Sequence, residues 1–437
     1  MANSDSAGEH LKQTENSGGR VRWLIAALLF GETVLNYLDL QTLSVVAPEL
    51  TKAIGLTNVQ YSHIAEAFQI AYLFSFVVGG WIIDKLGVRL GLFLSIVWWS
   101  LAAAAHGFAH SAHDFVIFRV LLGIGYPGAY MAAAKAASEW FPPQERGFVT
   151  GIYSGGATVG ATVAPPLIAW LTLAYSWRDA FFVTGAAGLL YAIVWVLVYR
   201  QPSEHPWLRQ AEKQYILSNR QDDKTRTPPL NEILPYLFRN RYFWAVVFGR
   251  MIGDTPWIFY VLWIPKYLSE SKGLDLRAIG YIAWIPFLFS DIGSLAGGWL
   301  SGWYIRHGQE AVHARLRVMR ACAAVSSFTF AIYFVHSVAG VVALMSVMML
   351  CVMGWMINLS TVPVDAFPQE VVGTAVGLTT AGAIIGQLAF TFAIGHIVEA
   401  YSFGPLFFIM SALAPISYGV IRLILRKTPD FASSPAD

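Results

Sequence analysis

The chain has 437 residues, of which 56% are hydrophobic and 13% are charged. Soluble domains carry about 25% charged residues, so this composition excludes a soluble enzyme. The formal net charge is only +2, which gives no sign of a basic surface for nucleic acid. Because a transmembrane helix needs about 20 mostly apolar residues, the hydrophobic fraction is large enough for many of them. We expect an all-α polytopic membrane protein.

Hydropathy along the chain predicts twelve transmembrane helices. They cover residues 21–44, 60–83, 88–108, 113–137, 147–171, 178–199, 241–265, 277–301, 316–335, 338–361, 371–395 and 403–425. A polar, charged and Pro-containing segment follows the sixth span, as expected of a linker. The predicted parts are a disordered cytoplasmic tail (1–19), an N-terminal six-helix half (20–199), a cytoplasmic linker (200–239), a C-terminal six-helix half (240–425) and a second cytoplasmic tail (426–437).

The positive charges predict the orientation. Loops on one side of the predicted membrane hold only five Lys and Arg residues, namely Lys52, Arg178, Lys266, Lys272 and Arg277. Most of the others fall on the side of the two termini and the linker, and positively charged loops stay inside. We expect a multi-pass membrane protein with both termini in the cytoplasm, and the family resemblance described below implies the bacterial inner membrane.

The two halves share an internal repeat. The sequence GGW at 79–81 recurs at 297–299, an offset of 218, and the dipeptide FP at 141–142 recurs at 367–368, an offset of 226. The second pair is followed by glycines at the same spacing, Gly147, Gly151, Gly156 and Gly160 matching Gly373, Gly377, Gly382 and Gly386. One such pair can reflect close helix packing alone. Two blocks in the same order indicate parallel repeats, which in one class of transporters place the substrate between the halves.

The loop between the second and third spans reads GWIIDKLGVR. It resembles the loop signature of the major facilitator superfamily, and its Asp84, Lys85 and Arg89 are candidates for a charge latch that gates the protein. An ordinary positively charged inner loop is the alternative. In the second half, Gly302 stands where the Asp of this signature is expected.

Further segments resemble the anion:cation symporter family of that superfamily, and within it the bacterial hexuronate-type transporters. They are NYLD at 36–39, EWFPPQER at 139–146, WRDAF at 177–181, YRQPSEHP at 199–206 and WIPKYL at 263–268. The resemblance implies inward symport of a carboxylated sugar or similar organic anion with protons. Two residues depart from the family pattern: Leu40 replaces an Arg, and Tyr126 replaces a Glu that the family uses in proton coupling.

Ionisable residues inside membrane helices are costly and suggest function. Glu32, Asn36 and Asp39 share one face of the first helix at i, i+4 and i+7, and we expect this stripe to line a central cavity. Asp39 is the principal candidate for proton coupling. Glu32 and Glu66 are the other candidates, although Glu66 could equally pack against a polar neighbour.

Candidate substrate ligands lie on several helices. Arg119 is the one cation deep in the N-terminal half, where it could bind a carboxylate or pair with Asp39. Arg250 and Asp254 lie at i and i+4, so they could also neutralise each other. The remaining candidates are Asn36, Tyr37, Tyr126, Ser154, Thr158, Trp257, Tyr260 and Gln387. For the neutral side chains among them, hydrogen bonding between helices is the alternative.

These features predict a secondary active transporter, not an enzyme, that takes up an organic anion such as a sugar acid by alternating access. The expected partners are the substrate, protons and the lipid bilayer, with the protein a monomer and with no cofactor and no metal site. No GxxxxGK[ST] motif for ATP occurs. A uniporter, or a symporter for another carboxylate, an aromatic acid or a neutral substrate, is the alternative. A membrane receptor is disfavoured because the polar segments are too short for a signalling domain.

Overall fold

The structure is a computed structural model that describes residues 20–55, 58–218, 228–273, 282, 284–401 and 403–426. Most of the described residues are helical, and none of them forms a strand. The predicted tail at 1–19 and all of the tail at 426–437 except Arg426 lie outside the described residues.

The N-terminal half contains the first six spans. They are formed by α2 (Val21–Ile54), α3 (Asn58–Ala105), α4 (Ala112–Gly125), α5 (Pro127–Trp140), α6 (Pro143–Ala174) and α7 (Trp177–Val198), with a short 3-10 turn at His106–Phe108. Helix α3 covers two predicted spans and is interrupted at Gly87, whose φ of 74° is a conformation that glycine adopts readily. Helices α4 and α5 form one span that is interrupted before Pro127, because proline cannot continue the backbone hydrogen bonds of a helix interior.

The linker and the C-terminal half follow. The linker holds α8 (Gln210–Ser218) and α9 (Leu230–Arg239). The half contains α10 (Arg241–Gly253), α11 (Thr255–Lys272), α13 (Ile285–Arg306), α14 (Ala311–Ser326), α15 (Ala331–Phe334), α16 (Val338–Ala366), α17 (Val372–Tyr401) and α18 (Gly404–Leu425), with a 3-10 turn at Gln369–Val371. Within the described part of the chain, eight helical segments are long and apolar enough to cross a membrane by themselves. The other predicted spans are shorter, interrupted or more polar, as where α10 and α11 meet at Asp254.

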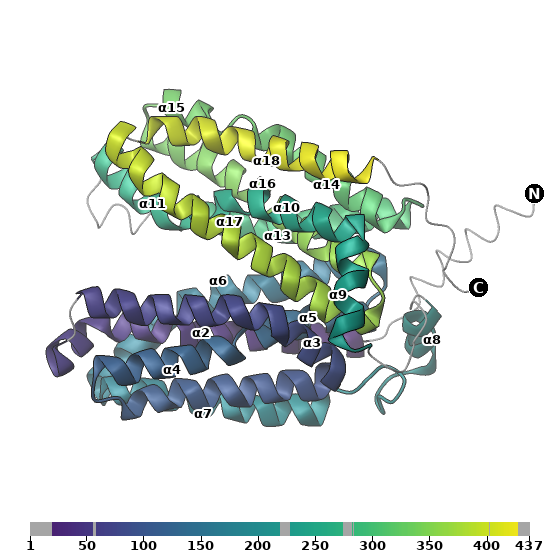
Figure 1. Ribbon diagram of the computed structural model, residues 1–437, viewed down its shortest axis with the longest axis horizontal. Helices are drawn as coiled ribbons and strands as arrows, with labels where there is room; N and C mark the ends of the chain where they lie inside the picture. The colour runs from purple at the N-terminus through teal and green to yellow at the C-terminus, as the bar shows by residue number, and fades with distance from the viewer. Residues whose placement is uncertain are drawn as a thin grey trace, which may run out of the picture.

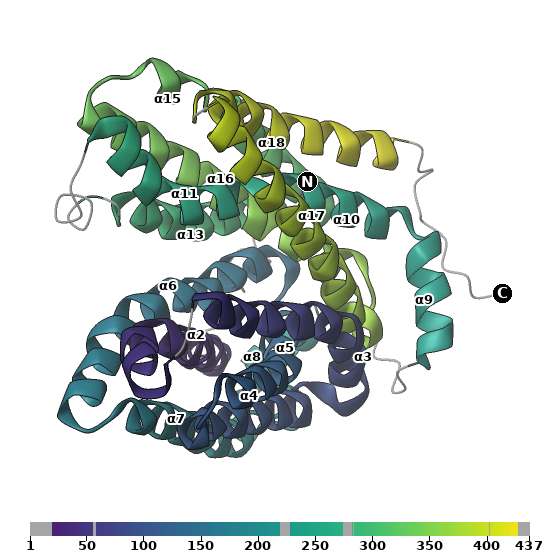
Figure 2. The same ribbon diagram turned by 60° about the vertical axis from the view of Figure 1, so that its left-hand side comes forward.

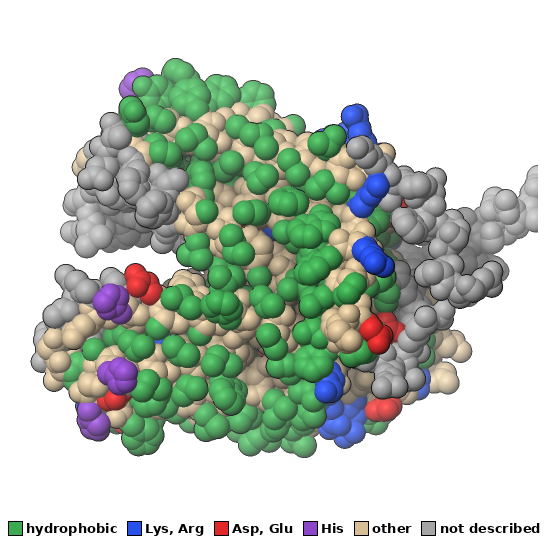
Figure 3. Space-filling model, in the orientation of Figure 1, with side chains coloured by type: hydrophobic (Ala, Val, Ile, Leu, Met, Phe, Trp, Pro, Cys, Tyr) green, Lys and Arg blue, Asp and Glu red, His purple; other side chains and the backbone are tan. Residues whose placement is uncertain are grey.

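The two halves are separate helix bundles that converge at one end (Figure 1). That end carries α8 and α9, and we call it the linker end. Figure 2 shows α17 of the C-terminal bundle running down to α3 of the N-terminal bundle. At the opposite end, which we call the far end, the space-filling view is hollowed between the halves (Figure 3). Hydrophobic side chains cover the flanks, while Lys and Arg gather at the linker end, as the charge pattern predicts.

Glycines of the repeat form close contacts between the halves. A Cβ atom on Gly80 of α3 would lie 2.2 Å from the carbonyl oxygen of Gly373 at the start of α17. A Cβ on Gly298 of α13 would lie 2.2 Å from the carbonyl oxygen of Gly147 at the start of α6. These crossings are counterparts under the repeat, so the prediction of two repeated halves is confirmed.

The later glycines of the repeat pack within each half. Gly156 and Gly160 face α2, where added Cβ atoms would lie 2.6 Å from Phe30 O and 2.5 Å from Val34 O. In the C-terminal half Gly386 faces α10 in the same way, 2.1 Å from the carbonyl oxygen of Met251. The small residues of α6 and α17 therefore allow two kinds of close contact. The start of each helix contacts the other half, and its later part contacts the first helix of its own half.

We expect the Gly80→Ala variant to be less stable. The new methyl group has only backbone to displace, and overpacking of this kind costs about 1–3 kcal/mol. Gly155→Ala is the matched control, because a Cβ there meets nothing within 4 Å. The thermal unfolding midpoint of each detergent-purified variant measures the effect, and an equal midpoint for both would contradict the tight crossing.

Candidate functional site

A cavity of about 260 Å³ lies between the two halves. Side chains from α2, α3, α5, α6, α10, α11, α16 and α17 line it. Many of the predicted site residues meet on this lining: Glu32, Asn36, Tyr37, Tyr126, Ser154, Thr158, Arg250, Trp257 and Gln387. Residues from five predicted spans, far apart in the sequence, are thus brought to one place.

Other candidates lie away from the lining. Asp39, Arg119, Asp254 and Tyr260 are buried, with exposed fractions of 3%, 3%, 0% and 1%, and Glu66 is exposed on α3. Asp39 and Glu32 share a helix face as expected, but only Glu32 reaches the cavity. The two carboxylates therefore occupy different surroundings on one helix.

Asp39 lies behind the cavity wall within the N-terminal half. Neither of its carboxylate oxygens has a hydrogen-bond partner among the described residues. Its polar neighbours are Thr184, Trp99 and the Arg119 guanidinium, whose charge acts on it. Arg119 itself lies over the ring of Phe68, with its guanidinium carbon 5.8 Å from the ring centroid. The structure thus places the predicted proton site and the deep cation of this half side by side.

Tyr126, at the break between α4 and α5, closes one side of the cavity. Its hydroxyl donates a hydrogen bond to the backbone carbonyl of Asn36 at 2.7 Å. The ring also contacts Phe68, Tyr72 and Trp99, with centroids 5.5 to 6.3 Å apart. The residue that replaces the family's Glu is therefore tied to the backbone of α2.

Arg250 supplies the positive charge of the cavity. Among the described lining residues it is the one cation, and Glu32 is the one carboxylate. Its Nε donates to Asp254 Oδ2 at 2.8 Å and its Nη1 donates to Thr380 Oγ1 at 2.6 Å. Asp254 and Thr380 thus hold the planar guanidinium in place at the cavity wall.

The cavity is also strongly aromatic, which the sequence did not reveal. Tyr72, Tyr130 and Tyr153 line it in addition to the expected aromatic residues. Tyr130 and Tyr153 contact each other, with centroids 6.4 Å apart. The available signal was helical spacing, because Tyr130 follows Tyr126 by one turn. Aromatic rings with hydroxyl groups can both stack on a ligand and hydrogen-bond to it.

Two polar contacts link helices at the cavity wall. Thr158 of α6 donates to Asp291 of α13 at 2.9 Å, which joins the two halves. The Gln387 amide donates to the backbone carbonyl of Asp254 at 3.4 Å, next to the break between α10 and α11. These two candidates therefore have structural partners in addition to their place on the lining.

Asp84 closes the linker end together with α17. Its carboxylate forms an ion pair with Lys135 at 2.8 Å and accepts hydrogen bonds from the backbone N–H groups of Gly373 and Thr374 at 2.9 and 2.7 Å. The Thr374 hydroxyl adds a further bond at 2.7 Å. Because the N-terminus of a helix attracts negative charge, this is a favourable position for a buried carboxylate.

The other two residues of the predicted latch lie elsewhere. Lys85 is exposed and packs over the ring of Trp81, with Nζ 4.8 Å from the ring centroid. Arg89 donates to the backbone carbonyl of Val196 at 2.7 and 3.1 Å. In this conformation Asp84 pairs with Lys135 instead. The signal for this pair in the sequence was a Lys two residues before the end of the predicted span 113–137.

The second half closes the linker end with a different acid. Asp365, at the end of α16, pairs with Arg146 of the first half at 3.0 Å and with Arg315 of its own half at 3.1 Å. Arg315 also reaches the Pro143 carbonyl at 2.8 Å. A Cβ on Gly302 would lie 2.0 Å from the carbonyl oxygen of Gln144. An Asp side chain therefore has no room at 302, which explains its absence from the repeated signature.

Comparison with known families identifies the fold. The model of the Major Facilitator Superfamily matches residues 29–363, most of the chain. The chain belongs to this superfamily. It is thus a multi-pass membrane protein, as the hydropathy predicts.

Curated relatives within the major facilitator superfamily are similar over most of the chain. The Hexuronate transporter of Escherichia coli (strain K12) is 29% identical over 417 residues, which cover 94% of this chain and 95% of that protein. The Galacturonate transporter of Dickeya chrysanthemi is 32% identical over 280 residues, covering 64% and 81%. The resemblance to hexuronate-type transporters is thereby confirmed.

A solved transporter has the same fold. The major facilitator transporter FucP, in a crystal structure of its outward conformation, matches 93% of this chain and 99% of its own, with a TM-score of 0.71 and 17% identity. This likeness confirms the predicted twelve-helix architecture of the superfamily.

Proposed function

We propose that this protein takes up a sugar acid together with a proton, by alternating access of the central cavity to the two sides of the membrane. The observation that carries the proposal is the cavity between the halves, where one fixed arginine faces hydroxyl and aromatic side chains. Curated relatives named as hexuronate and galacturonate transporters support the substrate class.

Arg250 binds the substrate carboxylate in this proposal. A guanidinium matches the geometry of a carboxylate, and Arg250 has further N–H groups beyond those that bind Asp254 and Thr380. The neutral polar side chains around it contact the sugar hydroxyls, and Trp257 packs against the ring. Arg119 is the second candidate for the carboxylate, although it lies behind the wall near Asp39.

Alternating access is supported by the contacts at the linker end. Both glycine crossings and both acidic clusters join the halves there. If the linker end is cytoplasmic, as the charge pattern predicts, this conformation is closed to the cytoplasm and corresponds to the outward-facing state. Asp84 and Asp365 then act as gate residues that must separate before the cavity opens inward.

Proton coupling follows from the driving force. Moving a monovalent anion into a negative-inside cell costs about 2.3 kcal/mol per 100 mV, and one accompanying proton cancels this term. Asp39 is the proposed proton site because both of its oxygens lack hydrogen-bond donors among the described residues. Glu32, which faces the cavity with one unpartnered oxygen, is the other candidate. Two replacements favour the uniporter alternative, since they remove two charges that the family uses. These are Leu40 and Tyr126, whose hydroxyl donates to the backbone carbonyl of Asn36.

We expect Arg250→Lys to weaken sugar-acid binding at least about tenfold, because the ammonium lacks the planar fork. Arg250→Gln with Asp254→Asn removes the charge without leaving a buried acid unpaired, and it should abolish the preference for a hexuronate over the neutral sugar. Isothermal titration of purified protein measures both effects. Arg119→Lys is the comparison variant, and normal binding in the Arg250 variants with loss in Arg119→Lys would transfer the role to Arg119.

We expect Asp39→Asn to retain substrate binding and counterflow while losing accumulation driven by a proton gradient, since the amide mimics the protonated acid. The measurement is uptake into proteoliposomes with and without an inward proton gradient. Glu32→Gln tests the cavity carboxylate, and exposed Glu66→Gln tests the third candidate. Accumulation that survives in Asp39→Asn but not in Glu32→Gln would move the proton site to Glu32. A wild type indifferent to the gradient would establish the uniporter.

We expect Asp84→Asn to slow transport while keeping substrate affinity within a fewfold, because the residue acts on the closed linker end and not on the cavity. Lys135 is left without its carboxylate, so the closed state loses stability. Lys85→Gln in the same loop is the matched control and should transport normally. The comparison pairs initial uptake rates with calorimetric affinity, and a loss of binding in Asp84→Asn would argue against a gate.

A further inference from the structure

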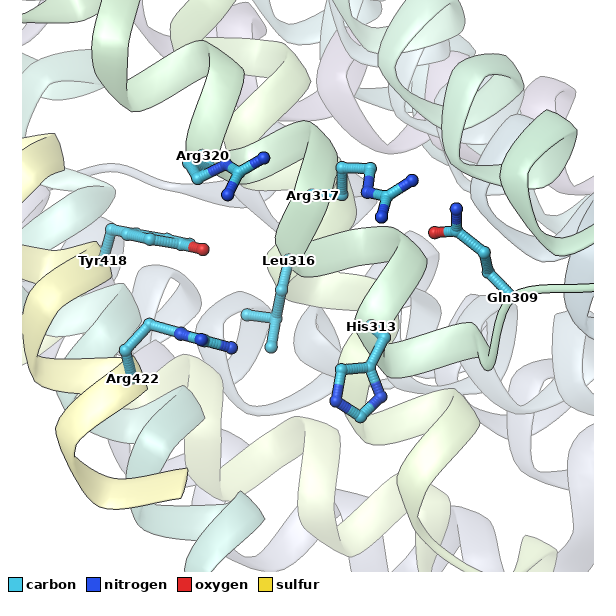
Figure 4. A pocket seen from close by; sticks show the side chains of 7 residues that line it. All are labelled: Gln309, His313, Leu316, Arg317, Arg320, Tyr418 and Arg422. Atoms are coloured by element: carbon cyan, nitrogen blue, oxygen red, sulfur yellow. The ribbon is translucent and has the colours of Figure 1, made fainter. Parts of the chain in front are cut away.

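A second pocket lies on the linker end of the C-terminal half, far from the central cavity in the fold. It has a volume of about 150 Å³ and opens between α14 and α18. Its lining residues are Gln309, His313, Leu316, Arg317, Arg320, Tyr418 and Arg422. Figure 4 shows Tyr418 and Arg422 extending from α18 toward Leu316 and the arginines of α14.

The lining is positively charged. It contains three arginines and one histidine but no carboxylate. Among the described residues, Arg317, Arg320 and Arg422 form no ion pair, and Glu310, just before α14, pairs with His313. Arg317 also lies over the ring of Tyr304, 5.1 Å from the ring centroid. The described lining therefore has several guanidinium groups and no carboxylate.

These arginines lie close to the predicted cytoplasmic ends of two membrane spans. Arg320 lies four residues inside the predicted span 316–335, which is about 6 Å along the helix axis. Around the pocket, Leu423 and Ile416 are 65% and 52% exposed, as expected of side chains that face lipid. Trp303 and Tyr304 lie near the end of the preceding helix α13, and aromatic residues at such a helix end are typical of the membrane interface. The arginines thus lie at the depth expected for lipid headgroups.

A cation at this depth needs a partner, because an unpaired charge in the membrane is costly. The described residues supply no carboxylate to this cluster, so an anion that the membrane provides is a suitable partner. Phosphate groups suit the site, since guanidinium binds phosphate through paired, charge-assisted hydrogen bonds. Basic pockets between transmembrane helices on the cytoplasmic side are typical sites for phospholipid headgroups.

We propose that this pocket binds the phosphate of an anionic phospholipid in the cytoplasmic leaflet. Arg320 and Arg422, on facing helices, hold the phosphate, Arg317 adds positive charge, and Tyr418 and Gln309 offer neutral donors at the rim. The acyl chains continue along the apolar surface of α14 and α18. The site is independent of the proposed transport activity. Both helices belong to the C-terminal half, so the bound lipid stabilises the packing of α14 with α18 and not the contacts between the halves.

The experiment titrates the detergent-purified full chain with phosphatidylglycerol and with phosphatidylcholine and counts bound lipids by native mass spectrometry. We expect wild type to prefer phosphatidylglycerol by about tenfold, because phosphatidylcholine carries the same phosphate but offsets its charge with a choline cation next to the arginines. Arg320→Gln combined with Arg422→Gln should abolish the preference. Arg426→Gln is the matched control, since Arg426 is an exposed arginine on the same end of α18 outside the pocket.

A lysine variant and a competition with soluble phosphates test the lipid assignment further. Arg320→Lys with Arg422→Lys keeps both charges and should retain part of the preference even if the glutamine variant does not fold. Inorganic phosphate and glycerol phosphate are added as competitors to wild type, and neither should displace the lipid at equal concentration. Displacement by either would assign the site to a soluble phosphate. An unchanged preference in the folded glutamine variant, or none in wild type, would overturn the proposal.

Discussion

The closed linker end depends on places where the backbones of the two halves touch. At Gly80 with Gly373, and at Gly298 with Gly147, the absence of a side chain lets the helices approach more closely than any other residue allows. This approach is also what makes the buried charge of Asp84 tolerable. The N–H groups at the start of α17 come within hydrogen-bond distance of its carboxylate, so backbone donors of one half neutralise an acid of the other.

The two repeated halves place the acid that joins them at different positions. The first half places its acid on the loop signature at Asp84, whereas the second places it at Asp365, at the end of α16. The reason is steric, because the position equivalent to Asp84 is Gly302, which lies against the backbone of Gln144. Each acid still joins both halves. The second half therefore lacks the Asp of the loop signature but keeps an acid that joins the halves, at another position of the fold.

Sequence predicts the fold of this chain well, because membrane helices follow directly from apolar length and charge bias. It predicts only some of the residues that line the cavity. Helical spacing places Glu32 and Asp39 on one face, but whether a face meets the cavity depends on how each helix is rotated and tilted in the bundle. Tyr72 and Tyr153 were missed because a lone aromatic in an apolar helix carries no polar signal. Lys135 was missed because its partner lies 51 residues away.

The charges of the cavity explain how one substrate can engage both halves. Leu40 and Tyr126 leave the first half with aromatic rings, hydroxyl groups and the single carboxylate Glu32 on the lining, while the second half contributes Arg250. On the proposed function, an anionic group binds the C-terminal half and the hydroxyl groups bind the N-terminal half. Because Asp254 and Thr380 already fix Arg250, the carboxylate joins an existing network instead of having to order it. A bound sugar acid then bridges the halves, which ties recognition to the movement that separates them.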